Sequence, residues 1–443
     1  MPLIQPSMRS RRLLALARMC LSLSLFGCGG ATITPDASTS DAGTTDVAID
    51  GDRPIGDVTY YSDVRPILTQ HCLSCHVAGA IAPFPLDTYS AARTEAGRIA
   101  EATRSRTMPP YLADASGACR TFRDARWLSE HEIGVLEAWR DQATPEGDAT
   151  IPAPVIPSLP QLTGTISTLD TGVEYTPNAA MADDYRCFVV EAPIATGTYF
   201  VTGSEARPGN PRIAHHLIVY APRTDEAAQA ARALDAAEDG PGYTCFGGSG
   251  VNALPAALWA PGAGATLYPT HTGIQLTGGR PLIVQIHYNT LAGPGMSDRT
   301  QIDLSTVTTG VTPAYWVPIA DFALHVAPHL ASVSAGATER VGDLTNLPLS
   351  LRVFGTAPHM HLLGRTVHVD MDHAAGGTEC LVDVPRWNFN WQMAYFYETP
   401  LPITPDDRLT ITCSYDTTSR DGDVVWGEGT QDEMCIDFLY LSL

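Results

Sequence analysis

The stretch LSLRVFGTAPHMHLLG, residues 349–364, shows how the larger part of this sequence is built. Apolar side chains alternate with other residues over 349–354, which is the period of a strand that buries one face. The stretch then presents two histidines, His359 and His361, two positions apart. On a strand, side chains at this spacing share a face, so both imidazoles can reach one metal ion without distortion. The segment therefore predicts a strand that carries a candidate metal site.

Similar short apolar runs, separated by Gly, Pro, Asn and Asp, recur from about Leu159 to the C-terminus. They include residues 218–220, 282–288, 409–415 and 436–443. Helical periodicity is weak in this region, except at residues 225–238. A strand-rich region of this length predicts two β-sandwich or jelly-roll domains of about 140 residues each. We place them at residues 158–308 and 309–443.

Three further histidines and one methionine stand out in the β-rich region. His215 and His216 are adjacent, and because neighbouring strand residues face opposite sides, both can reach one metal only at a strand end or a bulge. His287, in QIHY, would complete a site of three histidines. Met434, in DEMC, offers a thioether beside a cysteine. Two histidines with one methionine favour copper over zinc, because a thioether is a soft ligand that suits Cu(I).

The region before the strands contains a candidate haem site. Residues 60–76, YYSDVRPILTQHCLSCH, end in the CxxCH arrangement of covalent c-type haem attachment. The thiols of Cys72 and Cys75 lie on one helical turn and can each bond a vinyl group, and His76 would ligate the iron. A CxxC disulfide or half of a zinc site is the alternative. Met108, in TMPPY, is the candidate second axial ligand because prolines stiffen its loop, and a core methionine is the alternative.

The same region predicts a small helical domain. Residues 129–141, SEHEIGVLEAWRD, open with a serine that has a glutamate three positions later, which is a capping box, and then continue with helical apolar spacing. The stretch 58–149 resembles the small cytochrome c domains, many of which end in such a helix. A proline-rich run at 150–157 marks its boundary. His71, beside the CxxCH motif, is predicted to be a surface residue. The expected fold is therefore mainly β, with two jelly-roll β-sandwich domains preceded by a small α-helical cytochrome c-like domain.

The N-terminal residues predict export. A basic segment precedes the apolar run 13–26, which is too short to span a bilayer, so residues 1–27 are interpreted as a signal peptide. The run ends in LFGC, which resembles a bacterial lipobox with Cys28 as the lipidated residue. Phe26 departs from the small residue usual there, so simple secretion is the alternative. Residues 28–57 predict a flexible linker. We expect a bacterial lipoprotein that faces the periplasm or the cell surface and touches the membrane only through its lipid anchor.

Charge and cysteine content narrow the possibilities further. A formal net charge of −21 argues against a nucleic-acid partner, and an acidic, solvated surface explains it. Ten cysteines in an exported chain indicate an oxidising compartment. Three disulfides are conceivable among the cysteines that the signal, lipobox and CxxCH motif leave over, but spacing alone does not pair them. These six are Cys119, Cys187, Cys245, Cys380, Cys413 and Cys435.

Four motifs, in the order HHLIVY, VQIHYNT, PHMHLLG and DEMC, resemble the ligand motifs of the copper type II, ascorbate-dependent monooxygenases. That family includes peptidylglycine α-hydroxylating monooxygenase and dopamine β-monooxygenase. The resemblance covers about residues 159–443 and fills all six ligand positions. It implies two jelly-roll domains separated by a solvent cleft, two copper ions, and an external reductant such as ascorbate.

The resemblance also implies a division of roles. The electron-transfer copper would be held by His215, His216 and His287. The copper that binds oxygen would be held by His359, His361 and Met434, and oxygen activated there would hydroxylate a substrate C–H bond. A small organic substrate and O2 are thus the expected partners.

Two cysteine pairs also follow from the resemblance. Cys413 and Cys435 match a family disulfide, whose loop of about 20 residues would contribute roughly 3 kcal/mol and fix the neighbouring methionine. Cys187 matches another family half-cystine, with Cys245 as its nearest partner. The remaining two cysteines have no counterpart in the family.

The positions that would contact the substrate differ from those of the peptidylglycine enzymes. Those enzymes have an arginine two residues before the first histidine of the HxH motif, where this chain has Ala357. Where they present an asparagine and a tyrosine to the peptide carboxylate, this chain has Ile436 and Phe438. Peptide amidation is therefore not expected, and a more apolar or neutral substrate is the hypothesis.

The fused haem suggests that a small reductant, or a redox partner protein such as another cytochrome, feeds electrons through the haem to the copper at the three histidines. The alternative function is a non-catalytic haem and copper electron-transfer or copper-binding lipoprotein. A zinc-stabilised β-sandwich adhesin or hydrolase leaves Met434 unexplained, and no acidic pair or GxSxG motif supports hydrolysis. The histidines outside the motifs are interpreted as ordinary, although the first of them is a candidate for orienting the first copper site. They are His271, His325, His329, His368 and His373.

Overall fold

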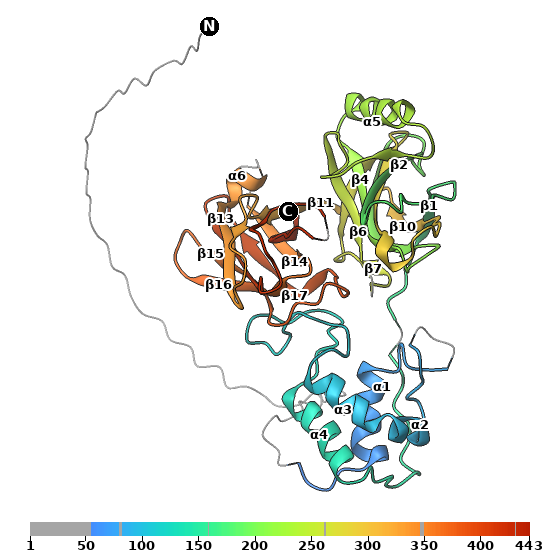
Figure 1. Cartoon of the computed structure of the whole chain (residues 1–443), viewed down its shortest axis with the longest axis vertical. Coiled ribbons are helices and arrows are strands. Elements are labelled where there is room, and N and C mark those ends of the chain that lie inside the picture. Colours follow the sequence, from blue (N-terminus) through green and yellow to red (C-terminus); the bar gives the residue numbers. More distant parts are fainter. Residues whose placement is uncertain (1–54, 79–81, 158, 261–262, 346–349, 430) are drawn as a thin grey trace, which may run out of the picture. The chain divides into compact units, whose positions relative to one another are not determined.

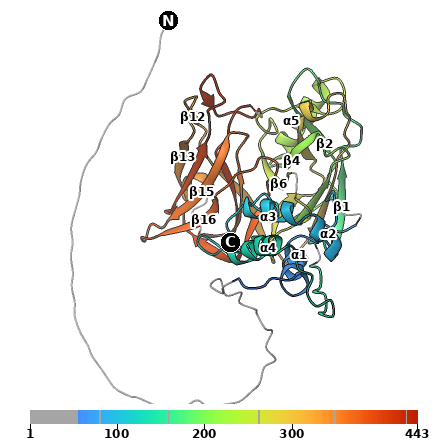
Figure 2. The same ribbon diagram turned by 60° about the horizontal axis from the view of Figure 1, so that its bottom comes forward.

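The computed structural model describes residues 55–443, except 79–81, 158, 261–262, 346–349 and 430. The expected signal peptide, the lipidation site Cys28 and nearly all of the expected linker lie outside these residues. The described chain has a helical segment followed by many strands, which confirms the predicted mainly β class (Figures 1 and 2). No helix in the described part is long and apolar enough to cross a bilayer.

The helical segment contains a π-helical turn and four α-helices, which are η1 Tyr60–Val64, α1 Arg65–His71, α2 Tyr89–Thr94, α3 Ala96–Arg104 and α4 Glu130–Asp141. The predicted capping box is confirmed at the start of α4. The Ser129 side chain accepts from the Glu132 N–H, and the Glu132 carboxylate accepts from the Ser129 N–H. Leu68, Leu136 and Trp139 belong to the small core that these helices enclose.

The prediction that His71 lies on the surface is wrong. Its side chain is only 10% exposed, and its Nε2 lies 3.1 Å from a carboxylate oxygen of Glu132. The capping box holds this glutamate in place, so a buried acceptor is available where α1 ends. A histidine there is satisfied by a tertiary partner 61 residues away, which local sequence does not reveal.

The first half of the β-rich region is built from ten strands and one long helix. The strands are β1 Thr165–Asp170, β2 Asp183–Val190, β3 Thr198–Arg207, β4 Ala214–Pro222, β5 Tyr243–Thr244, β6 Ala253–Trp259, β7 Thr266–Leu267, β8 Thr272–Thr277, β9 Leu282–Asn289 and β10 Gln301–Val307. The predicted helix is α5 Asp225–Ala237, and a short 3-10 turn, η2, spans Thr290–Ala292. Strands β5, β2, β9, β4 and β6 form one sheet in that order.

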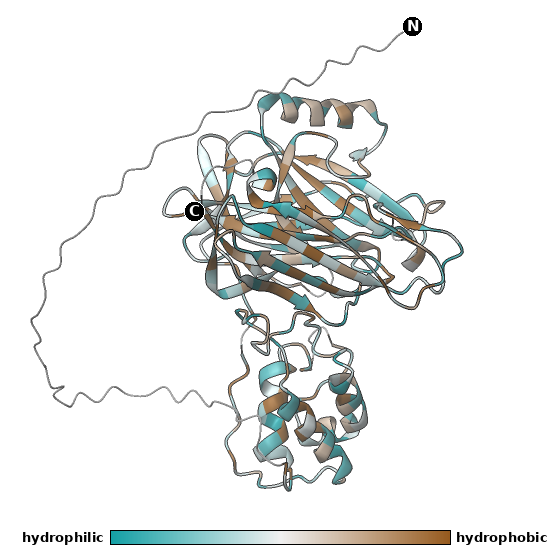
Figure 3. Cartoon of the chain, turned by 90° about the vertical axis from the view of Figure 1, so that its left-hand side faces the viewer, coloured by the Kyte–Doolittle hydropathy of each residue, from teal (hydrophilic) through white to brown (hydrophobic). Residues whose placement is uncertain are grey.

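The second half contributes the remaining strands and a short helix. They are β11 Thr312–Ala320, β12 His325–Val326, β13 Val333–Arg340, α6 Val341–Thr345, β14 Leu351–His359, β15 Gly364–Asp372, β16 Thr378–Val384, β17 Tyr395–Ile403, β18 Arg408–Tyr415, β19 Val424–Val425 and β20 Ile436–Ser442. Strands β13, β18, β15 and β16 form a four-stranded sheet. Figure 3 shows hydrophobic and hydrophilic residues alternating along many of the strands, as the sequence period predicted.

One sheet runs through both halves. Its strand order is β1, β10, β3, β8, β11, β20, β14 and β17, with β7 paired to β3. The two halves join where β8 pairs in parallel with β11, with Thr272 opposite Thr312. Trp316 of β11 and Tyr440 of β20 accordingly pack in the same hydrophobic core as Tyr199 and Ile286 of the first half. The two halves are therefore joined by main-chain hydrogen bonds.

Residues 109–127, between α3 and α4, pack with the second half of the β region. Tyr111 and Phe122 are buried in the same core as the strands β14, β15, β17 and β18. Phe122 pairs with Tyr397 of β17, and Cys119 is bonded to Cys380 of β16. We call residues 109–127 the strap. The stretch 58–149 thus contains a segment that contributes to a β core as well as the helical core.

All six cysteines left over by the sequence motifs are paired. The bonds Cys413–Cys435 and Cys187–Cys245, implied by the family resemblance, are present. The third bond joins Cys119 and Cys380 across a sequence separation of 261 residues. A pair this far apart leaves no local signal in the sequence.

We expect that replacing both Cys119 and Cys380 by serine loosens the strap. Closing a long loop restricts the unfolded chain, so the loss should lower the free energy of unfolding by roughly 2–5 kcal/mol. Limited proteolysis should then cut within 109–127, whereas Ala118→Ser, an exposed change in the same segment, should leave it protected. Equal protection in the double variant would show that packing of Tyr111 and Phe122 alone holds the strap.

Candidate metal and haem sites

The first candidate metal site joins two adjacent histidines of β4 with one of β9. The pairing of β4 with β9 shifts register between Ala214 and His216, near the start of β4, which fits the expectation that two adjacent histidines share one site only at a strand end or a bulge. His287 lies opposite His216 on β9. The Nδ1 atom of His216 lies 3.2 Å from that of His215 and 3.4 Å from that of His287. Nitrogens around a tetrahedral ion, at about 2.0–2.1 Å from it, are about 3.3 Å apart, so the three atoms fit one ion.

Residues of β2 orient His287. Its Nε2–H donates to the Asp183 carboxylate at 2.8 Å, so its lone pair is on the Nδ1 that faces His216. The Tyr185 ring stacks on the His287 imidazole at 4.1 Å. The pairing of β2 with β9 places both residues beside His287, because Tyr185 lies directly opposite it. The sequence analysis missed Asp183 and Tyr185, whose only signal is a polar start to an apolar strand.

Burial keeps this histidine cluster neutral. It lowers the pKa of His215 to about 3 and holds the pKa of His216 well below the usual value. It also lowers the pKa of His287, although the Asp183 carboxylate opposes this. The His215 ring stacks on Phe389 at 4.2 Å. Neutral imidazoles keep the lone pairs that a metal ion requires.

The second candidate site forms where β14 ends and β20 begins. His359 is the last residue of β14, and His361 lies two residues beyond it, so the expectation that both share a strand is only half right. Their ring centres are nevertheless 5.1 Å apart. Met434, two residues before β20, lines the same cavity and is 7% exposed. His359, His361 and Met434 therefore line one cavity.

Hydrogen bonds orient the two imidazoles alike. The Nδ1–H of His359 donates to the side-chain oxygen of Gln392 at 2.5 Å, and the Nδ1–H of His361 donates to the Asp432 carbonyl at 3.1 Å. The Gln392 amide nitrogen donates to the Phe389 carbonyl, which settles the direction of the amide. Each Nε2 is therefore left with its lone pair as a ligand atom.

Glu433 connects the segment that carries His361 to the segment that carries Met434. Its buried carboxylate accepts from the N–H of His361 at 2.9 Å and from the N–H of Leu363 at 2.5 Å. Burial raises the pKa of Glu433 to about 7. The next residue, Met434, is also held by the Tyr415 hydroxyl, which donates to its carbonyl at 2.9 Å. Neither Glu433, although it lies in the DEMC motif, nor Gln392 was predicted to have a role in the site.

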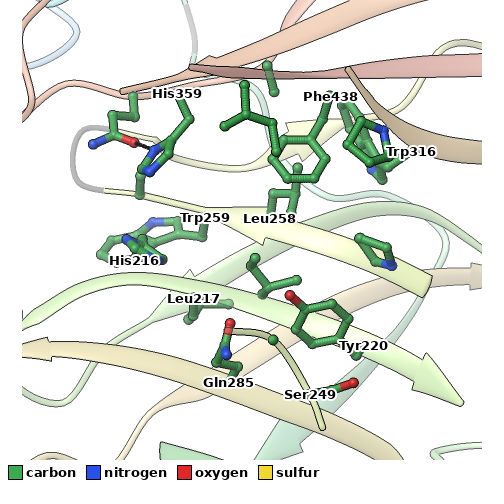
Figure 4. A pocket seen from close by; sticks show the side chains of 18 of the residues that line it. His216, Leu217, Tyr220, Ser249, Leu258, Trp259, Gln285, Trp316, His359 and Phe438 are labelled. Carbon is green, nitrogen blue, oxygen red and sulfur yellow. Dashed lines mark hydrogen bonds between the residues drawn. The ribbon is translucent and has the colours of Figure 1, made fainter. Parts of the chain in front are cut away.

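The two sites adjoin. The ring centre of His216 lies 5.6 Å from that of His359, and Phe389 contacts both His215 and His361. Where the family resemblance implied a solvent cleft between the domains, the histidines of the two sites are in ring contact. A cavity of about 750 Å³ begins at this point and extends between β4 and β6 on one side and β11, β14 and β20 on the other (Figure 4).

The CxxCH residues fit a covalently attached haem. Cys72 and Cys75 are free thiols, which argues against the alternative of a CxxC disulfide. The His76 Nδ1–H donates to the Phe84 carbonyl at 3.0 Å, which leaves Nε2 as the ligand atom. Met108 is 36% exposed, so the alternative of a core methionine is wrong. It directly precedes the strap.

A further group of potential metal ligands, which contains one histidine, does not form a metal site. His368, Asp370 and Cys380 lie close enough to share an ion, but Cys380 is in a disulfide and has no thiolate to offer. His368 is instead bonded to Asp370 and Asp383, and these carboxylates raise its pKa. His271 is exposed in a turn before β8, which fits its interpretation as an ordinary residue.

Asp437 makes the stability of this region depend on pH. Its fully buried carboxylate accepts from Thr356 Oγ1 and the Ala357 N–H, and burial raises its pKa from 3.8 to about 7. The folded state therefore holds a proton that the unfolded state releases, and this contribution to stability falls as pH rises from about 4 to 7. Over that pH range the free energy of unfolding of Asp437→Asn, measured with urea, should rise by about 1–3 kcal/mol relative to that of the parent. Exposed Asp421→Asn is the control. A parent-to-variant difference that does not change with pH would contradict the assignment.

Two family models match the chain. The N-terminal domain of the copper type II ascorbate-dependent monooxygenases matches residues 171–293, and the C-terminal domain matches 335–441. These matches cover just over half of the sequence. The chain belongs to the copper type II ascorbate-dependent monooxygenase family.

Curated relatives agree with this family. Tyramine beta-hydroxylase of Caenorhabditis briggsae is 25% identical over 339 residues, which are 72% of this chain and 54% of that protein. Dopamine beta-hydroxylase of Equus caballus is 25% identical over 292 residues, which are 59% of this chain and 47% of that protein. The chain spans about half the length of the curated relatives it matches. A solved Paenibacillus xanthan lyase aligns at 13% identity with a TM-score of 0.17, covering 63% of this chain and 25% of that one, which is too low to carry an argument.

Proposed function

We propose that this chain is a copper-dependent monooxygenase that hydroxylates a C–H bond of a small organic substrate, with O2 and an external reductant such as ascorbate. The observation that carries the proposal is the pair of unlike donor sets that adjoin one cavity. One set offers three Nδ1 atoms, from His215, His216 and His287. The other offers imidazole Nε2 atoms together with the thioether of Met434.

The donor chemistry supports a division of labour between the sites. The all-nitrogen set is fixed by Asp183 and stacked rings, which suits a metal that exchanges electrons without rearranging. The set with Met434 contributes all three of its side chains to the cavity lining, whereas the other set contributes only His216, so a substrate can approach the set with Met434 more readily. Copper, when bound, supplies the one-electron and oxygen chemistry. The chain supplies neutral imidazoles, which the Gln392 side chain and the Asp432 carbonyl orient.

We propose further that Cys72, Cys75 and His76 bind a c-type haem, with Met108 as its second axial ligand. The haem would carry electrons from a small reductant or a redox partner protein towards the copper held by the three histidines. Two features support this. The thiols are unpaired and the His76 tautomer is suitable. The strap that follows Met108 also links the haem segment to the β-rich region, through the Cys119–Cys380 bond and buried packing.

We infer an exported location, because three disulfides favour an oxidising compartment. A lipid anchor at Cys28 belongs to the same proposal, and that residue lies outside the described part of the chain. The expectation of no nucleic-acid partner rests on the acidic net charge of −21.

Oxygen consumption tests the function. Copper-loaded protein should consume O2 with ascorbate in a manner that depends on an added substrate, in a panel that includes tyramine, an N-acylglycine and neutral aromatic compounds. The names of the relatives make tyramine and dopamine the reference compounds. No uptake across a broad panel, while the haem still cycles between redox states, would favour a non-catalytic electron-transfer or copper-binding lipoprotein instead.

Removing the haem attachment tests the electron route. Replacing Cys72 and Cys75 by serine should abolish covalent haem, measured as the pyridine haemochrome of the denatured protein. Turnover driven by a reduced cytochrome should then fall at least about tenfold, which corresponds to a rise of about 1.4 kcal/mol in the activation free energy. Ser74→Ala, which keeps both thiols, is the matched control. Turnover unchanged with every reductant would show that the haem does not serve the coppers.

A further inference from the structure

The cavity wall beside His359 is apolar. Strands β14 and β20 pair so that Ala357 lies opposite Phe438 and His359 lies opposite Ile436. Side chains two positions apart on a strand share a face, so these four residues face the same side, and all of them line the cavity. The candidate ligand His359 is therefore flanked by hydrocarbon and aromatic side chains.

Strands β11 and β6 continue this apolar character, whereas the lining also includes the polar residues Tyr220, Ser249 and Gln285 (Figure 4). Trp316 and Pro318 of β11 extend the surface next to Phe438, and Pro318 is its strand partner. Leu258 and Trp259 of β6 lie across the cavity (Figure 4). The volume of about 750 Å³ falls within the 300–1,000 Å³ typical of sites for organic ligands. Indole and phenyl rings on facing walls favour a ligand that itself contains a ring.

Charged groups are scarce in the cavity. Among the described lining residues, Glu428 is the single carboxyl, and none is an arginine or a lysine. Burial raises the pKa of Glu428 to about 7, so a large share of it is uncharged near neutral pH. A carboxylate entering here would lose its hydration without gaining a cation, which is costly. The wall positions Ala357, Ile436 and Phe438 offer it no donor side chain either.

We propose that the substrate is an uncharged, predominantly apolar molecule with at least one ring, bound along β14 and β20 with its reacting C–H bond beside His359 and Met434. The proposal rests on the proposed monooxygenase function and names its substrate class. The ring would lie between Phe438 and Trp316 on one wall and the β6 side chains on the other.

Binding of three matched probes tests this class on the full copper-loaded chain, kept oxidised and without reductant so that no turnover occurs. The probes share one ring system and differ in charge: 2-(2-naphthyl)ethanol, 2-(2-naphthyl)ethylamine and 2-naphthylacetate. Equilibrium dialysis should show the alcohol bound at least about tenfold more tightly than either charged probe. The amine binding as tightly as the alcohol would overturn the proposal in favour of a cation paired with Glu428. Preferential binding of the acetate, or binding of none of the three, would also overturn it.

Variants sharpen the test. Ala357→Arg should weaken binding of the alcohol and strengthen binding of 2-naphthylacetate, because it places a guanidinium on the wall beside His359. Ala230→Arg, the same change on the exposed face of α5, should alter neither. Phe438→Leu removes the ring and keeps the wall apolar, so it should weaken the alcohol severalfold even if the arginine variant does not fold. Unchanged affinities in both cavity variants would contradict the assigned wall. Since dialysis needs no turnover, this preference and the oxidation test can fail independently.

Discussion

Met434→Ala is expected to abolish substrate-dependent oxygen consumption while leaving copper bound at the three histidines. The thioether is the soft donor of the second site, and its main chain is anchored from both sides by Tyr415 and the Cys413–Cys435 bond. Without it, His359 and His361 offer two nitrogens, which hold Cu(I) weakly at an open position. We expect the oxygen uptake rate to fall on the order of 100-fold or more.

A matched substitution separates this effect from a general one. Met181→Ala removes the same side chain at a position that is 49% exposed and should leave both copper content and uptake unchanged. Copper content should fall by no more than one ion per chain in Met434→Ala. Uptake within about twofold of the parent, at comparable copper content, would show that oxygen is not activated at this methionine.

His216→Ala is expected to remove the other copper. His216 is the central member of the cluster, since its Nδ1 lies 3.2 Å from that of His215 and 3.4 Å from that of His287. Truncating it takes away the nitrogen that both other ligands approach. The protein should lose one copper ion per chain after dialysis, and turnover should fall on the order of 100-fold because the second site no longer receives an electron.

The control for this substitution is His325→Ala, whose side chain is 61% exposed and pairs with Asp423 at the surface. It should retain both copper ions and full turnover. A His216→Ala protein that binds two coppers, or that turns over normally with one, would contradict the division of labour between the sites.

The sequence could predict the features that depend on the local periodicity of side chains. The alternation of strand side chains required a strand end or a bulge at His215 and His216, and the structure has a register shift there. The apolar runs that predicted strands fall within β4, β9, β18 and β20, and the predicted helix is α5. The three histidines predicted to share one site do cluster, and His359, His361 and Met434 line one cavity.

The sequence could not predict partners that are distant along the chain. Asp183 reaches His287 across 104 residues, and Gln392 reaches His359 across 33. The end of β14 at His359 was also not predicted, because an HxH pattern is equally compatible with a longer strand. The pairing of β8 with β11 and the docking of the strap depend on tertiary packing between separate segments, which no local pattern encodes.

The most direct test of a two-copper monooxygenase is the mass of the product formed under ¹⁸O2. The copper-loaded protein would be given ascorbate and the substrate that supports the fastest oxygen uptake. The account predicts a product that carries one ¹⁸O atom, with water as the fate of the other oxygen. A product that contains oxygen from water alone, or consumption of O2 without any labelled product, would contradict it.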